Sequence, residues 1–505
     1  MLAKVWSGAV VGVDAYPVEV EVDFSRGLPA FNVVGLPDAA VKEARDRVRP
    51  ALKNSGFDFP TKRITINLAP ADMKKEGAAF DLPMAMGILV AMAMVSPTRT
   101  REYLLVGELS LNGELKPVRG VLPIATMVRE KGFKGVIIPK GQGEEGALVE
   151  GIEVYEMSTL LEVVGFLNGS SSHPPVVVDR EALFSQSSIY QEDFSDVKGQ
   201  EAAKRAMEVA VAGGHNLLMV GNPGTGKTML ARRIPTVMPP LSFEEALETT
   251  KIHSVAGTLK GPLMATRPFR APHHTVSDAA LIGGGSIPHP GEVSLAHNGV
   301  LFLDELPEFK RSTLEVLRQP LEDGVVTIAR AALTLTYPAR FMLVASMNPC
   351  PCGYLGHPTR ECTCTPTQIK RYQSRISGPL LDRIDLFVTV PALEYQELRQ
   401  EAPQTSSSQM RERIARARRV QEERFEGSGI HCNAHMGVRE IKEFCVLDER
   451  SHALMETAVR RFSLSGRGYH RILKVARTIA DMEESERIMA AHVAEAIQYR
   501  EHSLA

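Results

Sequence analysis

The stretch Asn216-Leu-Leu-Met-Val-Gly-Asn-Pro-Gly-Thr-Gly-Lys-Thr228 decides the fold of the region around it. It reads as a short apolar strand, a glycine loop and the start of a helix, and from Gly221 to Thr228 it fits the pattern G-x-x-x-x-G-K-[ST]. Because glycine has no Cβ, such a loop can turn successive backbone N–H groups toward phosphate oxygens at a helix N-terminus. The stretch therefore predicts a nucleotide-phosphate site rather than a plain turn before a helix.

The whole loop is expected to contact the nucleotide: Gly221, Asn222, Pro223, Gly224, Thr225, Gly226, Lys227 and Thr228. The Lys227 ammonium would neutralise the β- and γ-phosphates of ATP. The Thr228 hydroxyl would reach a Mg²⁺ ion. ATP and Mg²⁺ are therefore the predicted substrate and cofactor.

A second run, Gly299-Val-Leu-Phe-Leu-Asp-Glu305, supplies what a neighbouring strand must add to such a site. It is an apolar strand pattern that ends in two carboxylates. We expect Asp304 to hold Mg²⁺ and Glu305 to orient the attacking water. Taken alone, the run would also fit an ordinary strand followed by an acidic helix start at Pro307.

The bulk composition indicates a multidomain globular protein. The chain has 505 residues, of which 44% are hydrophobic and 23% are charged, which is enough for two to four domains. Its net charge of −2 argues against a protein that coats nucleic acid through its overall field, so any such binding must use a local patch. The longest apolar run, Leu82 to Val95, is too short to span a bilayer. No signal segment opens the chain, and a cytoplasmic location without membrane contact is expected.

Residues 1–167 alternate strand-like and helical runs, which predicts an α/β or α+β domain. The patterns Gly107-Glu-Leu-Ser-Leu-Asn-Gly-Glu-Leu115, Pro117–Ile124 and Gly135–Pro139 resemble the C-terminal proteolytic domain of Lon. Where that family carries its serine nucleophile, this chain has Lys75-Glu-Gly-Ala-Ala79, and the partner lysine position falls near Leu122. Without the hydroxyl and the amine, serine–lysine chemistry has no reagents, so a structural or docking domain is predicted.

Residues 168–189 form a linker by composition, and residues 190–399 are expected to be the ATPase core. Four patterns of this core together resemble the magnesium-chelatase-like AAA+ proteins: Arg270-Ala-Pro-His-His274, Gly283-Gly-Gly285, Gly299–Glu305 and Ser377-Gly-Pro-Leu-Leu-Asp-Arg383. With the Lon-like front domain, the resemblance narrows to the YifB/ComM family and covers essentially the whole chain. The adjacent histidines could be metal ligands, but neighbours on an extended segment point in opposite directions, which favours a structural or substrate-contacting role.

This resemblance implies further site residues. Asn348, at the end of a buried strand, takes the position of the polar sensor that helps to hold the attacking water. Arg383 takes the position of the arginine finger, which reaches the γ-phosphate of a neighbouring subunit. The alternative is an ion pair with Asp382 or Asp385. The second sensor arginine falls at Arg467, with Arg471 as the competing candidate.

The remaining segments complete the predicted architecture. Val325–Ala329 and Leu333–Tyr337 alternate as a hairpin with Arg330 near its tip. In the resembled family such a hairpin projects toward the central pore of a ring, and the alternative is a surface hairpin without a role. Residues 400–410 read as a second linker and 411–505 as a helical lid. The arginine-rich run Arg411–Arg424 is either a solvated helix face or a contribution to DNA binding. The predicted fold class is thus a multidomain α/β protein with a Lon-protease-like α+β domain, an AAA+ P-loop core and a C-terminal helical lid.

Four of the six cysteines cluster in two C-x-C pairs around a nine-residue loop. Cys350, Cys352, Cys362 and Cys364 could wrap zinc tetrahedrally and stabilise a loop too polar to pack by itself. Reduced structural thiols and occasional disulfides remain the alternatives. The clustering does not resemble the disulfide framework of a secreted protein.

The family resemblance implies a homo-oligomeric, hexameric DNA helicase that promotes branch migration when incoming DNA is recombined in natural transformation. Two alternatives stay open. One is a metal-insertion motor like the magnesium chelatase subunit. The other is a chaperone-like remodeller of proteins, which the Lon-like domain favours.

Overall fold

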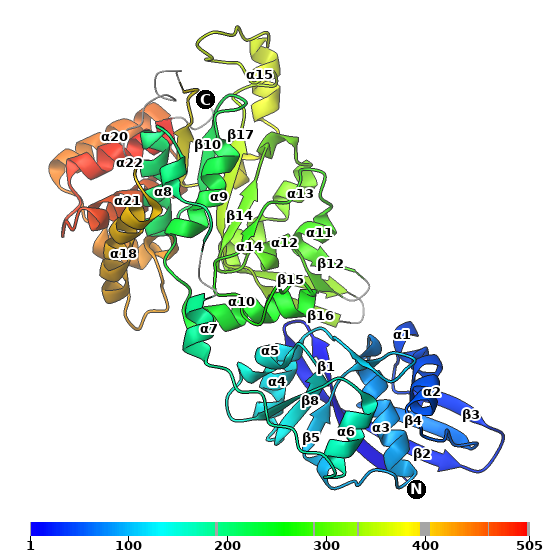
Figure 1. The fold of residues 1–505 in the computed structure, drawn as a ribbon. Coiled ribbons are helices and arrows are strands. Elements are labelled where there is room, and N and C mark those ends of the chain that lie inside the picture. Colours follow the sequence, from blue (N-terminus) through cyan, green and yellow to red (C-terminus); the bar gives the residue numbers. More distant parts are fainter. Residues whose placement is uncertain are drawn as a thin grey trace. The chain divides into compact units, whose positions relative to one another are not determined.

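The computed structural model describes residues 2–186, 190–285, 288–330, 333–393, 404–462 and 464–501. The chain forms two compact units, which are treated separately below (Figure 1). Unit 1 comprises Met1–Ser187 and Phe243–Ala265, and unit 2 comprises Ser188–Ser242 and Thr266–Ala505. Part of each predicted linker, residues 187–189 and 400–403, lies outside the described residues, as do residues 331–332 in the predicted hairpin.

Unit 1 is built on a seven-stranded mixed sheet of order β3-β4-β2-β1-β5-β8-β9. The β1–β2 and β2–β4 pairs are antiparallel, whereas the other neighbours are parallel. The strands of the unit are β1 (Ala3–Val11), β2 (Asp14–Ser25), β3 (Ala30–Val34), β4 (Arg63–Ala69), β5 (Tyr103–Leu105), β6 (Glu108–Leu109), β7 (Leu115–Lys116), β8 (Gly135–Pro139) and β9 (Glu153–Met157).

The helices of unit 1 are α1 (Ala39–Lys42), α2 (Ala44–Asn54), α3 (Asp81–Ala91), α4 (Val121–Glu130), α5 (Gly143–Ala147), α6 (Leu160–Leu167), α7 (Arg180–Gln186) and α10 (Phe243–Ala256). Every residue of α3 is buried, as expected for a helix that is apolar on all sides. A Cβ at Gly87 would lie 2.6 Å from Val22 Cγ2, so the glycine permits the close approach of α3 to β2. Lys75, in the segment compared with the peptidase nucleophile, is buried, and its Nζ donates to Met73 O at 2.7 Å.

Two segments differ from the sequence-based division. The predicted linker 168–189 contains α7, which lies beside α10 through an edge contact between Phe184 and Phe243. The stretch 243–265, assigned from sequence to the ATPase core, belongs to unit 1 because α10 packs on α4. The Ser254 hydroxyl donates to Glu145 Oε1 at 2.5 Å, and burial raises the pKa of Glu145.

Unit 2 contains a five-stranded, fully parallel sheet of order β11-β14-β17-β10-β18. The sheet consists of β11 (Phe269–Arg270), β14 (Val300–Leu303), β17 (Met342–Met347), β10 (Leu217–Val220) and β18 (Leu386–Thr389). β14 and β17 are buried along their whole length, which matches the near-continuous apolar runs typical of parallel strands covered on both faces. Because the strands are parallel, their carboxyl ends meet at one edge, where the loops that carry the predicted site begin.

The helices of this part of unit 2 are α8 (Glu201–Gly213), α9 (Lys227–Val237), α11 (Asp278–Ile282), α12 (Glu292–Leu295), α13 (Arg311–Glu315), α14 (Arg318–Asp323), α15 (Pro366–Gln373) and α16 (Gly378–Leu381). Two small antiparallel pairs are β12 (Gly283–Gly284) with β13 (His289–Pro290), and β15 (Val325–Arg330) with β16 (Leu333–Pro338). The second pair is the hairpin predicted from the alternating sequence.

The C-terminal part of unit 2 is helical, with α18 (Ser407–Arg424), α19 (Val438–Phe444), α20 (Glu449–Phe462), α21 (Gly466–Met482) and α22 (Ala490–Glu501) (Figure 1). α18 packs against α8, α9 and α21 and buries Met410, Ile414 and Ala417 in the same core as the sheet. The predicted fold class is therefore confirmed for its α/β core with a parallel sheet and its helical C-terminal region.

The arginines of α18 mostly hold this packing together. Four of the six are hydrogen-bonded within unit 2: Arg411 to Thr236 O, Arg413 to Glu208, Arg418 to Val211 O and Arg424 to Asp481. Arg416 and Arg419 are exposed. The structure thus adds a third interpretation to the two drawn from the sequence. Most of these guanidinium groups bind α18 to the rest of its own unit.

The Asp481 carboxylate is the centre of a buried polar network in the helical region. Its side chain is fully buried and accepts hydrogen bonds from Arg424 Nη2 at 2.5 Å, Arg477 Nε at 2.9 Å and Asn433 Nδ2 at 2.7 Å. We expect Asp481→Ala to lower the free energy of unfolding by about 3–5 kcal/mol, because it leaves two buried guanidinium groups without their counter-ion. Denaturant unfolding checks this, with Glu456→Ala, which removes the partner of the exposed Arg460, as a control expected to cost less than about 1 kcal/mol. A loss below about 1 kcal/mol for Asp481→Ala would contradict the assignment.

In the part of the chain that the structure describes, no helix combines the length and apolar character needed to cross a bilayer.

Candidate nucleotide site

The glycine loop connects β10 to α9, as the sequence predicts. Gly224 and Gly226 have φ angles of +80° and +88°, conformations that L side chains rarely adopt, so these two positions require glycine. A Cβ at Gly221 would lie 2.4 Å from Val390 O, so this glycine permits close contact with the residue that follows β18. Helix α9 begins at Lys227, and its N-terminus faces the loop. The loop thus has the backbone that phosphate binding needs.

Lys227 folds back over this loop. Its Nζ donates to Gly221 O at 2.7 Å, to Asn222 O at 2.9 Å and to Asn348 Oδ1 at 3.3 Å. Burial lowers the pKa of Lys227, while the charges of Asp304 and Glu305 oppose that shift. The ammonium is therefore held by uncharged acceptors, which leaves its full charge for an anionic ligand such as a triphosphate.

Thr228 and Asp304 meet at the carboxyl edge of the sheet. Thr228 Oγ1 donates to Asp304 Oδ2 at 2.7 Å, and the Ser346 hydroxyl bonds to Asp304 Oδ1. The pairing of Leu303 with Ala345 places the ends of β14 and β17 side by side, which explains the contact between Ser346 and Asp304. A hydroxyl and a carboxylate are oxygen ligands of the kind that Mg²⁺ takes when it also binds phosphates. The donor set therefore fits the predicted ion, with Thr228 and Asp304 as its protein ligands.

Glu305 follows directly and is oriented by the backbone. Its φ is +54°, uncommon for a residue with a side chain, and its N–H donates to Asp304 Oδ1 at 3.1 Å. The Glu305 side chain is 54% exposed, and Oε2 lies 3.6 Å from His274 Nδ1. His273 bonds instead to Thr275 Oγ1 at 2.9 Å. Within the described residues, the two histidines belong to no group of three or more metal-binding side chains.

Asn348, directly after β17, joins the site through its hydrogen bond from Lys227. The structure thus brings together Lys227, Thr228, Asp304, Glu305 and Asn348, from the ends of three adjacent strands.

Arg383 does not lie among these residues. Its side chain is 6% exposed, Nη1 donates to Pro379 O at 2.6 Å, and Nη2 pairs with Glu322. The sequence interpretation offered Asp382 or Asp385 as ion-pair partners, whereas the structure pairs Arg383 with Glu322. To reach a phosphate on another copy, Arg383 must leave this pair.

The two candidates for the second sensor arginine differ in their surroundings. Arg467, in the first turn of α21, is exposed and makes no hydrogen bond or ion pair with the described residues. Arg471 lies 3.4 Å from Asp385 Oδ1. Burial would raise the pKa of Asp385, but the adjacent His215, whose Nδ1 lies 3.7 Å from Oδ2, the charge of Arg471 and a hydrogen bond from the Asn216 N–H hold it below its usual range. Arg471 therefore already neutralises a buried carboxylate, and Arg467 is the guanidinium available to a ligand.

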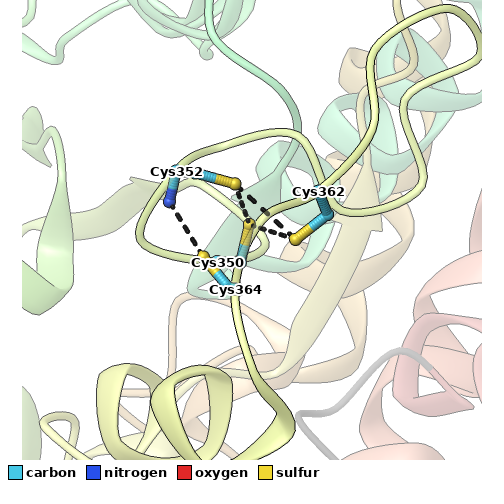
Figure 2. Close-up of side chains that lie close together, drawn as sticks. All are labelled: Cys350, Cys352, Cys362 and Cys364. Atoms are coloured by element: carbon cyan, nitrogen blue, oxygen red, sulfur yellow. Dashed lines mark hydrogen bonds between the residues drawn. The ribbon is translucent and has the colours of Figure 1, made fainter.

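The four clustered cysteines lie together (Figure 2). Their sulfur atoms all lie within 4.8 Å of one another, and the chain segment that carries them follows Asn348. Within the described residues, this is the only group of three or more side chains that could hold a metal ion. All four are free thiols.

Three contacts of the site were not predicted from sequence. Ser346 bonds to Asp304, His274 lies against Glu305, and Asn222 Nδ2 donates to Gly353 O at 2.6 Å. Ser346 carried a usable signal, since it is a polar residue near the end of an apolar strand. The other two contacts join segments far apart in the sequence, and no local pattern indicates them.

A parallel sheet with this strand order, a phosphate loop after β10, two carboxylates after β14 and a helical C-terminal region define the AAA+ class. Comparison with known families gives the same assignment. The description "Subunit ChlI of Mg-chelatase" matches residues 20–142, "Magnesium chelatase, subunit ChlI" matches residues 193–398, and "Magnesium chelatase, subunit ChlI C-terminal" matches residues 404–500.

Full-length relatives narrow the assignment. The chain is 47% identical to competence protein ComM of Haemophilus influenzae and 46% identical to the YifB protein of Escherichia coli, in each case over 503 residues that cover 99% of this chain and 97% of the relative. The magnesium-chelatase subunit ChlI of Guillardia theta is 27% identical over 183 residues, which cover 31% of this chain and 51% of that protein. The chain belongs to the YifB/ComM family of magnesium-chelatase-like AAA+ proteins.

Proposed function

We propose that this protein is a cytoplasmic, Mg²⁺-dependent ATPase that works as a homo-oligomeric, hexameric ring. The observation that carries the proposal is the contact of Thr228 with Asp304 at 2.7 Å, beside a Lys227 ammonium held only by neutral oxygens. A strand end without a ligand does not account for a hydroxyl, a carboxylate and a lysine that meet around a loop of backbone N–H groups. A triphosphate with its metal ion gives each of these groups a partner.

In the proposed reaction, the loop N–H groups and Lys227 bind the β- and γ-phosphates and stabilise the charge that spreads over the transferred phosphoryl group. Bound Mg²⁺ supplies further neutralisation of that charge. Glu305 orients the attacking water and accepts its proton, and His274 holds the carboxylate in place. Asn348 steadies the same water. Arg383 and Arg467 complete the site, with Arg383 contributed by the neighbouring copy.

Within this class, we propose that ATP hydrolysis drives movement on DNA, as a helicase that promotes branch migration during recombination of incoming DNA. Identity of 47% along the whole chain to a protein named for competence supports this over the alternatives. The β15–β16 hairpin, with the exposed Arg330 on β15, is the element proposed to contact DNA in the ring. A metal-insertion motor is the second candidate, because all three family matches carry the magnesium chelatase description.

Phosphate release measured with forked, single-stranded and duplex DNA tests the choice between these functions. We expect forked DNA to raise the rate and DNA affinity to fall about 10³-fold or more between about 50 and 200 mM salt, because binding displaces counter-ions from several phosphates. Arg330→Ala should weaken DNA binding, whereas Lys116→Ala removes an equivalent charge that Glu114 already pairs in unit 1. Stimulation by unfolded protein but by none of the DNA forms would replace the DNA motor with a protein remodeller.

A further inference from the structure

We propose that Cys350, Cys352, Cys362 and Cys364 hold one structural zinc ion, and that this ion fixes the turn on which the phosphate loop rests. The metal would thereby set the affinity of the chain for nucleotide. The second half of this inference rests on the ATP site proposed above, whereas the first half does not.

The sulfur positions match a tetrahedral tetrathiolate site. Cys350 Sγ lies 3.4 Å from Cys352 Sγ and 3.6 Å from Cys362 Sγ, and Cys352 Sγ lies 3.6 Å from Cys362 Sγ. A zinc ion with Zn–S bonds of about 2.3 Å separates its sulfur ligands by roughly 3.8 Å. Two disulfides would instead divide the four atoms into two bonded pairs, each at about 2.05 Å. None of these three pairs is at bonding distance, and all four sulfur atoms lie within 4.8 Å of one another, which favours a shared metal ion (Figure 2).

Groups around the sulfur atoms also suit thiolates. The backbone N–H of Leu355 donates to Cys350 Sγ at 3.4 Å, and that of Cys352 donates to Cys364 Sγ at 3.4 Å. Arg371 and Arg375 line the same cavity as Cys352 and Cys364. Zinc with four thiolates carries a net charge of −2, and these N–H groups and guanidinium groups would stabilise it.

The segment that carries the cysteines has little else to hold it. Residues 349–364 contain neither helix nor strand, and within this stretch only Cys350 and Gly353 are buried. Such a polar segment buries too little apolar surface to order itself, and a bound metal ion would supply the missing free energy of folding.

The same turn contacts the phosphate loop directly. Asn222 Nδ2 donates to Gly353 O at 2.6 Å and to Leu355 O at 3.4 Å. A Cβ at Gly353 would lie 2.7 Å from Pro223 Cδ, so the glycine permits its backbone to pack closely against the Pro223 ring. Leu355 thus bonds a zinc ligand through its N–H and the phosphate loop through its carbonyl.

A second connection runs through the chain itself. Cys350 is separated from Asn348 by one residue, and Asn348 accepts the hydrogen bond from Lys227. Loss of the metal would release the turn and with it the positions of Asn222 and Asn348. The expected loss of nucleotide affinity is about 10-fold or more, which corresponds to about 1.4 kcal/mol and so to the loss of about one hydrogen bond.

The metal site is tested first on the intact protein. Chain expressed with zinc in the medium and purified without chelator is expected to contain about one zinc per chain, in line with one four-ligand site. Cobalt exchanged into the same protein should give the strong visible absorption of tetrahedral, thiolate-bound Co²⁺. Protein without zinc, or cobalt bound without that absorption, overturns the proposal, and neither readout depends on variants or on ATP.

The link to the phosphate loop is tested with variants. Cys362→Ser/Cys364→Ser should lose zinc and bind a fluorescent ATP analogue about 10-fold more weakly. Thr363→Ala, in the same exposed segment, should change neither property. Asn222→Ala should keep zinc yet weaken nucleotide binding. Zinc loss with unchanged nucleotide affinity overturns the coupling, whereas normal zinc in a chain that never binds ATP contradicts the proposed ATPase instead.

Discussion

Glu305→Gln lowers kcat for ATP hydrolysis by about 100-fold or more and leaves the Kd for ATP within about twofold of the wild-type value. The amide keeps the size of the side chain but cannot accept the proton of the attacking water. Nucleotide binding depends instead on the loop, on Lys227 and on the Thr228–Asp304 pair, none of which the change touches. Single-turnover phosphate release and titration with a fluorescent ATP analogue measure the two quantities separately.

Two further variants serve as comparisons for Glu305→Gln, one that should lose nucleotide binding and one that should behave as wild type. Lys227→Ala should abolish detectable nucleotide binding, because it removes the cation that faces the phosphates. Glu456→Gln is the control, since Glu456 is an exposed carboxylate paired with Arg460 at 2.5 Å on α20, outside the site. Near-normal turnover in Glu305→Gln would contradict its role, as would equal loss of binding in the Glu305 and Lys227 variants.

Arg383→Ala lowers kcat by about 10³-fold, and activity returns when this variant is mixed with Lys227→Ala. Neither protein hydrolyses ATP by itself under the proposal. In a mixed ring, however, the intact phosphate loop of one copy meets the intact Arg383 of the next. Phosphate release as a function of the mixing ratio measures this rescue.

The control for the mixing experiment is the Lys227→Ala/Arg383→Ala double variant, which supplies neither group and should restore nothing. Light scattering confirms that each variant still assembles, because Arg383 also pairs with Glu322 in its own chain. Arg383→Lys retains the charge but loses the planar guanidinium, and we expect it to remain slow. A single Arg383→Ala protein with wild-type kcat would show that the arginine has only a structural role.

The local patterns of the sequence predicted which residues lie together at the centre of the candidate site. The loop glycines, Lys227 and Thr228 are adjacent in sequence, so one strand–loop–helix unit determines their positions. Asp304 and Asn348 could be placed because each follows an apolar strand, and the carboxyl ends of parallel strands meet at one edge.

Contacts between distant segments could not be predicted in this way. As the alternative to a finger role for Arg383, the sequence offered an ion pair with Asp382 or Asp385, yet Glu322, with which Arg383 pairs in the structure, lies 61 positions away. The run Arg411–Arg424 shows only its charges in the sequence, and not the carbonyl and carboxylate groups that those charges meet in the fold. The stretch 243–265 has an ordinary helical pattern, and only its packing on α4 reveals that it belongs to unit 1.

The cysteine cluster could be predicted from the sequence only in part. The C-x-C pairs predicted that four thiols could meet, and the structure places all four within 4.8 Å of one another. No sequence pattern indicated that the turn at Gly353, between these cysteines, contacts Asn222 and Pro223 of the phosphate loop. From the sequence, the cysteine-bearing segment was predicted only as a loop that zinc could stabilise. In the fold, the same segment contacts the phosphate loop.

The most direct measurement of the central claim follows inorganic phosphate release and molar mass in one sample of wild-type protein with Mg²⁺ and ATP. The account predicts that phosphate is released by an assembly of several copies and that the rate per chain falls as dilution separates them. A chain that stays monomeric with ATP present and releases no phosphate, with or without DNA, would contradict it.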